Sequence, residues 1–118
     1  MAKILIVDDE PGLRLLYSAE LADEGYDVVT AENCDDAAKA LQNEQIDLVV
    51  LDIQIRQESG LDMLQKIVKE HNDLPVILCS AYNCYKDDFS SWLADAYIVK
   101  SSNLDELKAE IARLLKNR

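Results

Sequence analysis

The stretch Ile4-Leu5-Ile6-Val7-Asp8-Asp9-Glu10 places four consecutive apolar residues directly before three acidic ones. A short, wholly apolar run is typical of a strand that is buried on both faces, as in a parallel sheet. Comparable runs recur along the chain at intervals of roughly 20 to 25 residues. They span residues 26–30, 48–51, 76–79 and 97–99. The sequence therefore predicts five strands, of which the first is the 4–7 run.

The segments between these runs have the periodicity of amphipathic helices. In the first segment Pro11 stands near the start and Gly25 just past the end, as is usual for a helix. Ser59 and Asp62 are placed to cap the third helix. The apolar stripes are Leu13-Leu16-Tyr17-Leu21, Ala37-Ala40-Leu41, Leu61-Leu64-Val68, Phe89-Trp92-Leu93 and Leu104-Leu107-Ile111-Leu114. This alternation predicts a doubly wound, five-stranded parallel sheet flanked by five helices, an α/β fold.

Length and charge limit the possible functions. The chain has 118 residues, the size of one domain, and 12 Lys and Arg against 23 Asp and Glu give a net charge of −11. Such a surface repels phosphate backbones and anionic lipid, so we expect no direct binding to nucleic acid or membranes. No stretch approaches the roughly 20 apolar residues of a membrane span, and the N-terminus does not have the pattern of a signal peptide. We expect a cytoplasmic protein.

Chemically active side chains follow the predicted strands, at the sheet edge where open α/β folds bind ligands. They are Asp8, Asp9 and Glu10 after the first run, Asp52 after the third, Ser80 after the fourth and Lys100 after the fifth. Each has an ordinary explanation by itself, as a helix cap, a turn residue or a solvated cation. Three neighbouring aspartates, however, would repel one another by several kcal/mol, and Mg²⁺ prefers such oxygen ligands. Asp52 beside Mg²⁺ could attack a phosphoryl group, while Lys100 and Ser80 stabilise its oxygens.

The motifs Ile4-Leu5-Ile6-Val7-Asp8-Asp9-Glu10, Leu51-Asp52-Ile53, Ser80-Ala81 and Tyr97-Ile98-Val99-Lys100 resemble the signature of the receiver domain of bacterial two-component response regulators. The resemblance covers essentially the whole chain, residues 1–118. It implies a flavodoxin-like sheet with the strand order 2-1-3-4-5. It also implies a phosphorylation-activated signalling switch of a phosphorelay, which catalyses only its own phosphorylation and dephosphorylation and is not otherwise an enzyme.

The resemblance assigns a role to each residue of the acidic site. Asp52 would be the phosphoacceptor, with a sensor histidine kinase or a histidine phosphotransfer protein as the donor. Asp9 and Asp52 would bind Mg²⁺ directly, and Asp8 would act mainly through water. Gln54 would contribute its backbone carbonyl to the metal.

The resemblance also implies a switch. Ser80 would close on the phosphoryl oxygen, Lys100 would pair with it, and Tyr97 would turn inward. The face made by the fourth helix, the fifth strand and the fifth helix would then change shape. A downstream protein target or an output domain would sense that change.

Three positions depart from the usual pattern of the family. Ile55-Arg56 stands where Met-Pro is common, and Ser80 replaces the commoner threonine but keeps the hydroxyl. Ser101 follows Lys100 where the family often has a proline after a cis bond. Because a cis bond before a non-proline residue costs about 2.5 to 4 kcal/mol, we expect the Lys100–Ser101 bond to be trans.

Two other classes of function stay open at this point. A phosphatase or phosphotransferase could work through an aspartyl phosphate, although such enzymes have a second acid two residues after the nucleophile, where this chain has Gln54. A receiver-like module could also bind partners without phosphate, but such modules usually lack one of the site residues. The chain ends without a linker, so we expect a stand-alone receiver rather than a piece of a larger regulator or hybrid kinase.

Overall fold

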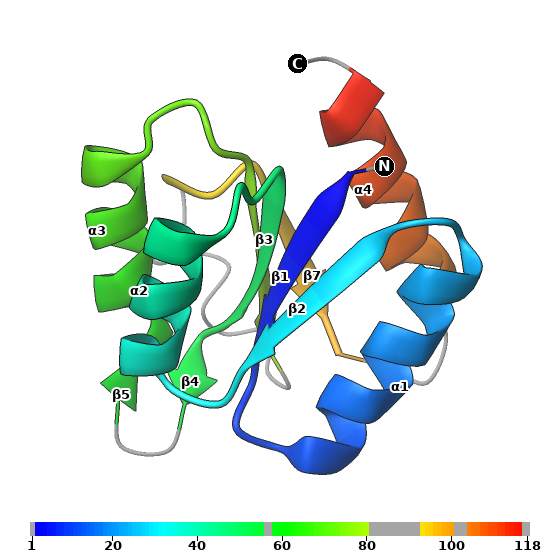
Figure 1. Ribbon diagram of the computed structural model, residues 1–118, viewed down its shortest axis with the longest axis horizontal. Coiled ribbons are helices and arrows are strands. Elements are labelled where there is room, and N and C mark those ends of the chain that lie inside the picture. Colours follow the sequence, from blue (N-terminus) through cyan, green and yellow to red (C-terminus); the bar gives the residue numbers. More distant parts are fainter. Residues whose placement is uncertain (1, 56–57, 81–92, 101–103, 117–118) are drawn as a thin grey trace.

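The computed structural model describes residues 2–55, 58–80, 93–100 and 104–116, and these residues form seven strands and four helices (Figure 1). The strands are β1 (Lys3–Val7), β2 (Asp27–Ala31), β3 (Leu48–Asp52), β4 (Gln54–Ile55), β5 (Glu58–Ser59), β6 (Val76–Ser80) and β7 (Ala96–Val99). The helices are α1 (Pro11–Asp23), α2 (Cys34–Asn43), α3 (Gly60–Glu70) and α4 (Asp105–Lys116).

Five of the strands form one parallel sheet in the order β2-β1-β3-β6-β7. Since β6 and β7 are the fourth and fifth apolar runs, the predicted order 2-1-3-4-5 is confirmed. No strand boundary differs from its run by more than one residue. The sequence did not predict the antiparallel ladder of β4 with β5, because two-residue strands are too short to show a period.

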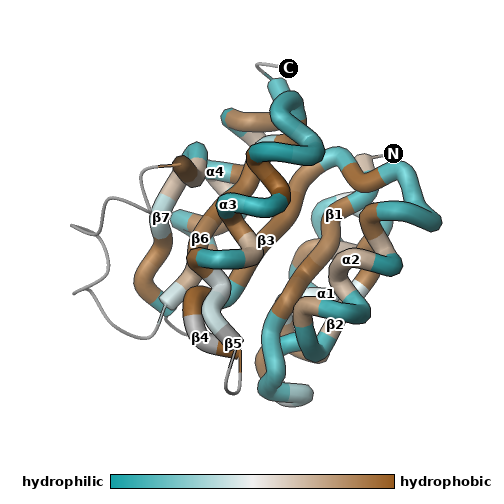
Figure 2. Tube along the Cα trace, turned by 90° about the vertical axis from the view of Figure 1, so that its left-hand side faces the viewer, coloured by the Kyte–Doolittle hydropathy of each residue, from teal (hydrophilic) through white to brown (hydrophobic). Residues whose placement is uncertain are grey.

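Helices cover both faces of the sheet, with α2 and α3 on one side and α1 and α4 on the other (Figure 1). Alternate residues of the central strands point to the two faces, and both sets are buried because each face has helices packed on it. Figure 2 shows the result as hydrophobic colour along most of β1 and β3 and alternating colours along the helices. The face toward α2 and α3 buries Leu5, Val7, Val49, Leu51, Val76 and Leu78. The face toward α1 and α4 buries Ile4, Ile6, Leu48, Val50, Ile77 and Cys79.

Local sequence signals set the ends of the helices. The Ser59 hydroxyl accepts a hydrogen bond from the Asp62 amide at 3.4 Å, which confirms the predicted cap of α3. Gly25 follows α1 with a φ of 95°, a conformation that costs glycine little. By contrast, Glu10 caps α1 without any side-chain hydrogen bond, and α1 has no acidic residue in its first turn.

The prediction for α1 was wrong at one position. Leu16 was expected in the buried stripe, but 41% of it is exposed, and its neighbour Leu15 is 74% exposed. Tyr17 and Leu21 are buried as expected, so the buried stripe of α1 is narrower than its apolar pattern. The predicted helix around Phe89 and Trp92 lies outside the described residues. Among the helices that the structure describes, none has the length and apolarity needed to cross a bilayer.

Candidate metal and phosphoryl site

Four of the predicted site residues meet at the carboxyl edge of the sheet because parallel strands all end there. Asp8 follows β1, Asp52 and Ser80 are the last residues of β3 and β6, and Lys100 follows β7. Asp8, Asp52 and Ser80 are 2%, 6% and 3% exposed, and they are the only buried polar residues in the described part of the chain. Burial of polar groups is costly unless they are paired, so their concentration at one edge marks a built site.

Three carboxylates converge in this site. One oxygen each from Asp8, Asp9 and Asp52 lie within 4.8 Å of one another, with Asp8 and Asp52 buried and Asp9 half-buried. No other group of three such ligands occurs in the part of the chain that the structure describes. A set of carboxylate oxygens at a half-open sheet edge suits a hard cation such as Mg²⁺, which prefers oxygen ligands and keeps part of its water.

Lys100 lies between two of these carboxylates. Its Nζ is 2.9 Å from Oδ2 of Asp8 and 3.0 Å from Oδ2 of Asp52, and only 12% of its side chain is exposed. Burial by itself lowers the pKa of Lys100, but the hydrogen bonds to Asp8 and Asp52 outweigh it and raise that pKa above its ordinary value. Lys100 is therefore positively charged at physiological pH and offsets one of the three negative charges.

The backbone around Asp8 is held from several directions. Its amide donates to the Ala31 carbonyl at 3.1 Å, which joins the ends of β1 and β2. Its carboxylate Oδ1 accepts the Glu10 amide at 2.9 Å. Through Oδ1, Asp8 thus stabilises the turn before α1, which is one of the ordinary roles expected from its position in the sequence. Its other oxygen, Oδ2, binds Lys100.

Gly60 lies against the backbone of the phosphoacceptor candidate. A Cβ added to Gly60 would overlap the carbonyl oxygen of Asp52 and the backbone of Ile53. The Gly60 amide also donates to the Ile53 carbonyl. The start of α3 therefore fixes the main chain that carries Asp52, and only glycine fits this approach.

The remaining predicted residues lie beside this centre. Gln54 begins β4, two residues after Asp52. Tyr97 is half-buried on β7, in register with Leu78 of β6. The Lys100 amide donates to the Ser80 carbonyl at 2.7 Å. Their roles toward metal and phosphate stay predictions, and the Lys100–Ser101 bond lies outside the described residues.

Sequence reasoning did not predict two contacts of the site, although Gly60 itself fits the resemblance as the glycine expected after the acceptor. The role of Gly60 as a close packing partner of Asp52 has no local signal, because it arises from the return of α3 onto β3. Arg14 was missed as well, and its guanidinium donates to the Asp8 carbonyl at 2.7 Å. A cation near the start of a helix opposes the helix dipole, and that anomaly could have indicated a role for Arg14 outside the helix.

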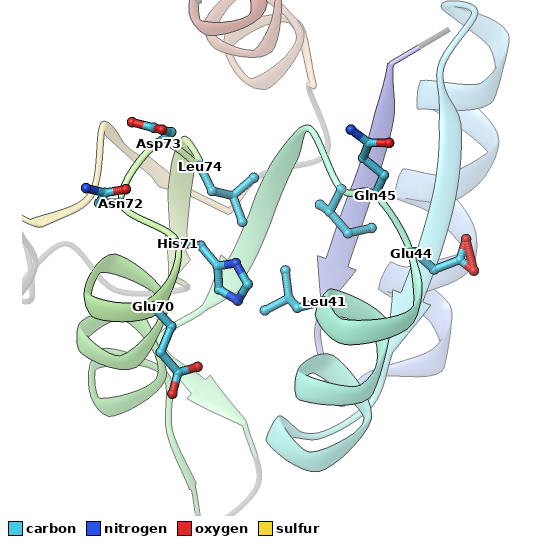
Figure 3. A pocket seen from close by; sticks show the side chains of 9 residues that line it. Leu41, Glu44, Gln45, Glu70, His71, Asn72, Asp73 and Leu74 are labelled. Atoms are coloured by element: carbon cyan, nitrogen blue, oxygen red, sulfur yellow. The ribbon is translucent and has the colours of Figure 1, made fainter.

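A separate hollow of about 410 Å³ lies at the opposite end of the sheet, between the C-terminal ends of α2 and α3 (Figure 3). Leu41 and Leu74 contribute apolar surface to it, while His71 and Glu70 contribute polar groups. Its side chains do not form a group of three metal ligands among the described residues. Within the described ranges, the group of carboxylates that could hold a metal ion thus lies at the carboxyl edge of the sheet, away from this hollow.

Cys79 on β6 has a reactive side chain next to the site, but its environment makes it inert. It is 2% exposed, and burial raises its pKa to about 12. The reactive form of cysteine is the thiolate, which is absent at physiological pH when the pKa is this high. Cys79 acts as a small apolar residue of the core.

The fold and the site together define an open α/β domain with an aspartate, a lysine and a cluster of cation ligands at the carboxyl edge of its sheet. The sequence matches the response regulator receiver domain family over residues 4–112, and the chain belongs to this family. Receiver domains are phosphorylated switches and typically not enzymes.

Two solved structures resemble the chain over nearly its whole length. The response regulator protein TrrA from Thermotoga maritima, in complex with Mg²⁺-BeF, has 47% sequence identity and a TM-score of 0.93, covering 97% of this chain and 99% of TrrA. The structure of the histidine kinase ThkA in complex with TrrA contains a chain with 48% identity and a TM-score of 0.91, covering 98% of this chain and 99% of that one.

Two curated relatives are about twice as long as this chain. The probable transcriptional regulatory protein TcrX of Mycobacterium tuberculosis is 35% identical over 115 residues, which are 96% of this chain and 49% of TcrX. A probable transcriptional regulator, ycf27 of Cyanophora paradoxa, is 37% identical over 97% of this chain and 48% of its own length. The chain thus spans about half the length of these relatives.

Proposed function

We propose that this chain is a phosphorylation-activated switch of a two-component phosphorelay, with residues 1–118 as its receiver domain and Asp52 as its phosphoacceptor. The observation that carries the proposal is the convergence of Asp8, Asp9 and Asp52 within 4.8 Å, with Lys100 3.0 Å from Asp52. The crystal structure of TrrA with Mg²⁺-BeF supports the same chemistry in a similar protein. A cytoplasmic location fits this role.

The donor set fits Mg²⁺. Asp9 and Asp52 would hold the ion directly, Asp8 mainly through water, and the backbone carbonyl of Gln54 would complete the protein ligands. When bound, Mg²⁺ supplies positive charge next to the oxygens of the transferred phosphoryl group.

The chain's own residues perform the transfer. The ionised carboxylate of Asp52 attacks phosphorus and forms an acyl phosphate, while the bond from phosphorus to the donor nitrogen or oxygen breaks. No proton has to be removed from Asp52, so the absence of a histidine at this edge is no obstacle. Lys100 keeps its charge and can pair with a phosphoryl oxygen, and Ser80 can donate a hydrogen bond to another.

The phosphoryl donor is proposed to be a histidine kinase or a histidine phosphotransfer protein. The structure of ThkA with TrrA shows such a pairing for a similar protein. On this chain the exposed leucines Leu15 and Leu16 lie on α1, which begins directly after the acidic site. We propose that this apolar surface contacts the donor protein while Asp52 receives the phosphoryl group.

The function is tested by incubating the protein with acetyl phosphate, with and without Mg²⁺, and measuring its intact mass. We expect Mg²⁺-dependent addition of one phosphoryl group to the wild type and none to Asp52→Asn. Asp73→Asn, an exposed acid beside the distant hollow, is the matched control and should be modified normally. Modification of Asp52→Asn, or modification of the wild type without any divalent cation, would contradict the proposal.

The same experiment separates the alternatives. Continued turnover of acetyl phosphate with no lasting adduct, and with activity on other phosphate esters, would indicate a phosphatase or phosphotransferase. A chain that takes no phosphate under any condition would be a phosphate-independent binding module. The presence of Gln54 in place of a second acid after Asp52, and the presence of Asp8, Asp9, Asp52, Ser80 and Lys100 together, favour the switch.

A further inference from the structure

Arg14 connects the first turn of α1 to the backbone of the acidic site. Its Nη1 donates to the Asp8 carbonyl oxygen at 2.7 Å, and its Nη2 is 4.0 Å from Oε2 of Glu32, which follows β2. Only 19% of the Arg14 side chain is exposed. A guanidinium that gives up most of its water for a backbone carbonyl makes a charge-assisted hydrogen bond, which is stronger and better oriented than a neutral one.

The position of Arg14 has no explanation in the stability of α1 itself. Cations near a helix N-terminus are unfavourable because they oppose the helix dipole. This helix also lacks a side-chain cap and has no acidic residue in its first turn. The start of α1 is therefore adapted to the loop that precedes it.

The orientation of the Asp8 carbonyl group determines how the chain runs from Asp8 to Asp9. The peptide unit is planar, so fixing the Asp8 C=O group also fixes the direction in which the chain enters Asp9. The Asp8 amide is already bound to the Ala31 carbonyl on the other side. Together these bonds clamp the peptides on both sides of Asp8, whose carboxylate and that of Asp9 converge with Asp52.

We propose that Arg14 is a positioning residue for the cation site. It holds the Asp8–Asp9 peptide so that both carboxylates face Asp52. This inference rests on the proposed function, because it assigns Arg14 a role in binding the Mg²⁺ that phosphoryl transfer requires.

Two physical effects of Arg14 on Mg²⁺ have opposite signs, which makes the proposal testable. As a nearby positive charge alone, Arg14 would repel the cation, so its removal would tighten binding. As a positioning residue it preorganises the ligands, so its removal weakens binding by about 10-fold, as is typical for groups that orient metal ligands. The order of affinities expected from positioning is wild type, then Arg14→Lys, then Arg14→Ala, whereas simple repulsion predicts the tightest binding for Arg14→Ala and similar affinities for the wild type and Arg14→Lys, which carry the same charge.

The experiment is a Mg²⁺ titration of backbone amide NMR shifts for the wild type, Arg14→Ala and Arg14→Lys. Arg113→Ala is the matched control, because Arg113 is a half-exposed arginine that pairs with Glu110 at 2.6 Å on α4. The Mg²⁺ affinity of Arg113→Ala should equal that of the wild type. Thermal unfolding of each metal-free variant reports the fold separately. We expect a weaker Mg²⁺ affinity for Arg14→Ala and partial recovery in Arg14→Lys.

A second readout divides binding from chemistry. The rate of phosphorylation by acetyl phosphate in Arg14→Ala should be low at limiting Mg²⁺ and should approach the wild-type rate at saturating Mg²⁺. If Arg14→Ala unfolds, the same comparison between Arg14→Lys and the wild type decides the question. If a folded Arg14 variant binds Mg²⁺ as tightly as the wild type or more tightly, the positioning role of Arg14 is wrong. That result leaves the proposed function unaffected. A wild type that binds no Mg²⁺ and takes no phosphate overturns the proposed function first.

Discussion

At the scale of single residues, the ammonium group of Lys100 pairs with both Asp8 and Asp52. Replacement by Met would leave two buried carboxylates without their counterion, because Asp8 and Asp52 keep only 3% and 8% of their side chains exposed. We expect Lys100→Met to lower the free energy of unfolding of the metal-free protein by about 3 kcal/mol, measured by urea denaturation. Saturating Mg²⁺ should reduce this deficit, because a bound cation supplies the missing positive charge.

Lys108→Met is the matched control. Lys108 pairs with a more exposed acid, Glu20, at 3.5 Å, and an exposed pair of this kind contributes about 0 to 1 kcal/mol. A Lys100→Met variant as stable as Lys108→Met would show that the two buried carboxylates do not depend on Lys100.

The contribution of Lys100 to stability also has a defined dependence on pH. Its pKa is raised above the ordinary value of 10.5, so the folded protein holds this proton more tightly than the unfolded chain. The stability that Lys100 provides is therefore fully present below pH 10.5 and is lost as the pH rises through the raised pKa. The difference between the wild type and Lys100→Met should stay constant from pH 7 to pH 9 and fall only in strongly alkaline solution.

At the scale of the element, the start of α3 determines where Asp52 stands. Gly60→Ala would force a Cβ into the Asp52 carbonyl oxygen, so we expect a loss of about 3 kcal/mol or more in the free energy of unfolding and a sharp loss of phosphorylation. Gly12→Ala is a matched control, since Gly12 lies in the first turn of α1 with no atom within 4 Å of its added Cβ. There we expect a gain of about 0.5 kcal/mol. Equal effects at the two glycines would contradict the packing argument.

The exposed side of α1 has a separate test. Leu15→Asp places a charge on the surface of α1 that is proposed to contact the phosphoryl donor. Leu15 makes few contacts with the core, because 74% of it is exposed. We expect slower phosphotransfer to Leu15→Asp from any histidine kinase that phosphorylates the wild type. The rate of phosphorylation by acetyl phosphate should be unchanged. Leu93→Asp, at another exposed leucine, is the control, and a loss of both rates in Leu15→Asp would indicate damage to the site instead.

Elements could be predicted from the sequence where one local signal dominated. The wholly apolar run from Val76 to Cys79 indicated a strand buried on both faces, and the positions of Asp8 and Asp52 at strand ends indicated a common site. Features that depend on tertiary packing could not be predicted. Leu16 has the helical spacing of a buried residue but lies at the border of the buried stripe, and the contact of Gly60 with Asp52 forms only when α3 returns to β3.

At the scale of the whole molecule, phosphorylation should be sensed at a distance from Asp52. Tyr97 is half-buried on β7, the strand that also leads into Lys100. If a phosphoryl group draws Ser80 toward it, space opens beside β6, and the Tyr97 ring should turn inward to fill it. We expect the ring resonances of Tyr97 to shift when Mg²⁺ and beryllofluoride saturate the site, and a 5- to 150-fold change in the affinity of a partner for the adjoining face, typical of such coupling. Unchanged Tyr97 resonances in the saturated complex would contradict this switch.

The ion pairs of Lys100 also have a consequence for the synthesis of the protein. Asp8 follows β1 and Lys100 follows β7, the first and last strands of the sheet in chain order, yet their side chains meet at 2.9 Å. While the chain emerges from the ribosome, the first acids are present long before the lysine that partners them, and β7 adds to the sheet only after the residues of this strand have left the exit tunnel. A nascent or truncated chain therefore lacks the assembled acceptor site. We therefore expect phosphoryl groups to enter only chains in which β7 and Lys100 are already in place, so that a receiver still being synthesised up to this point does not respond to the signal.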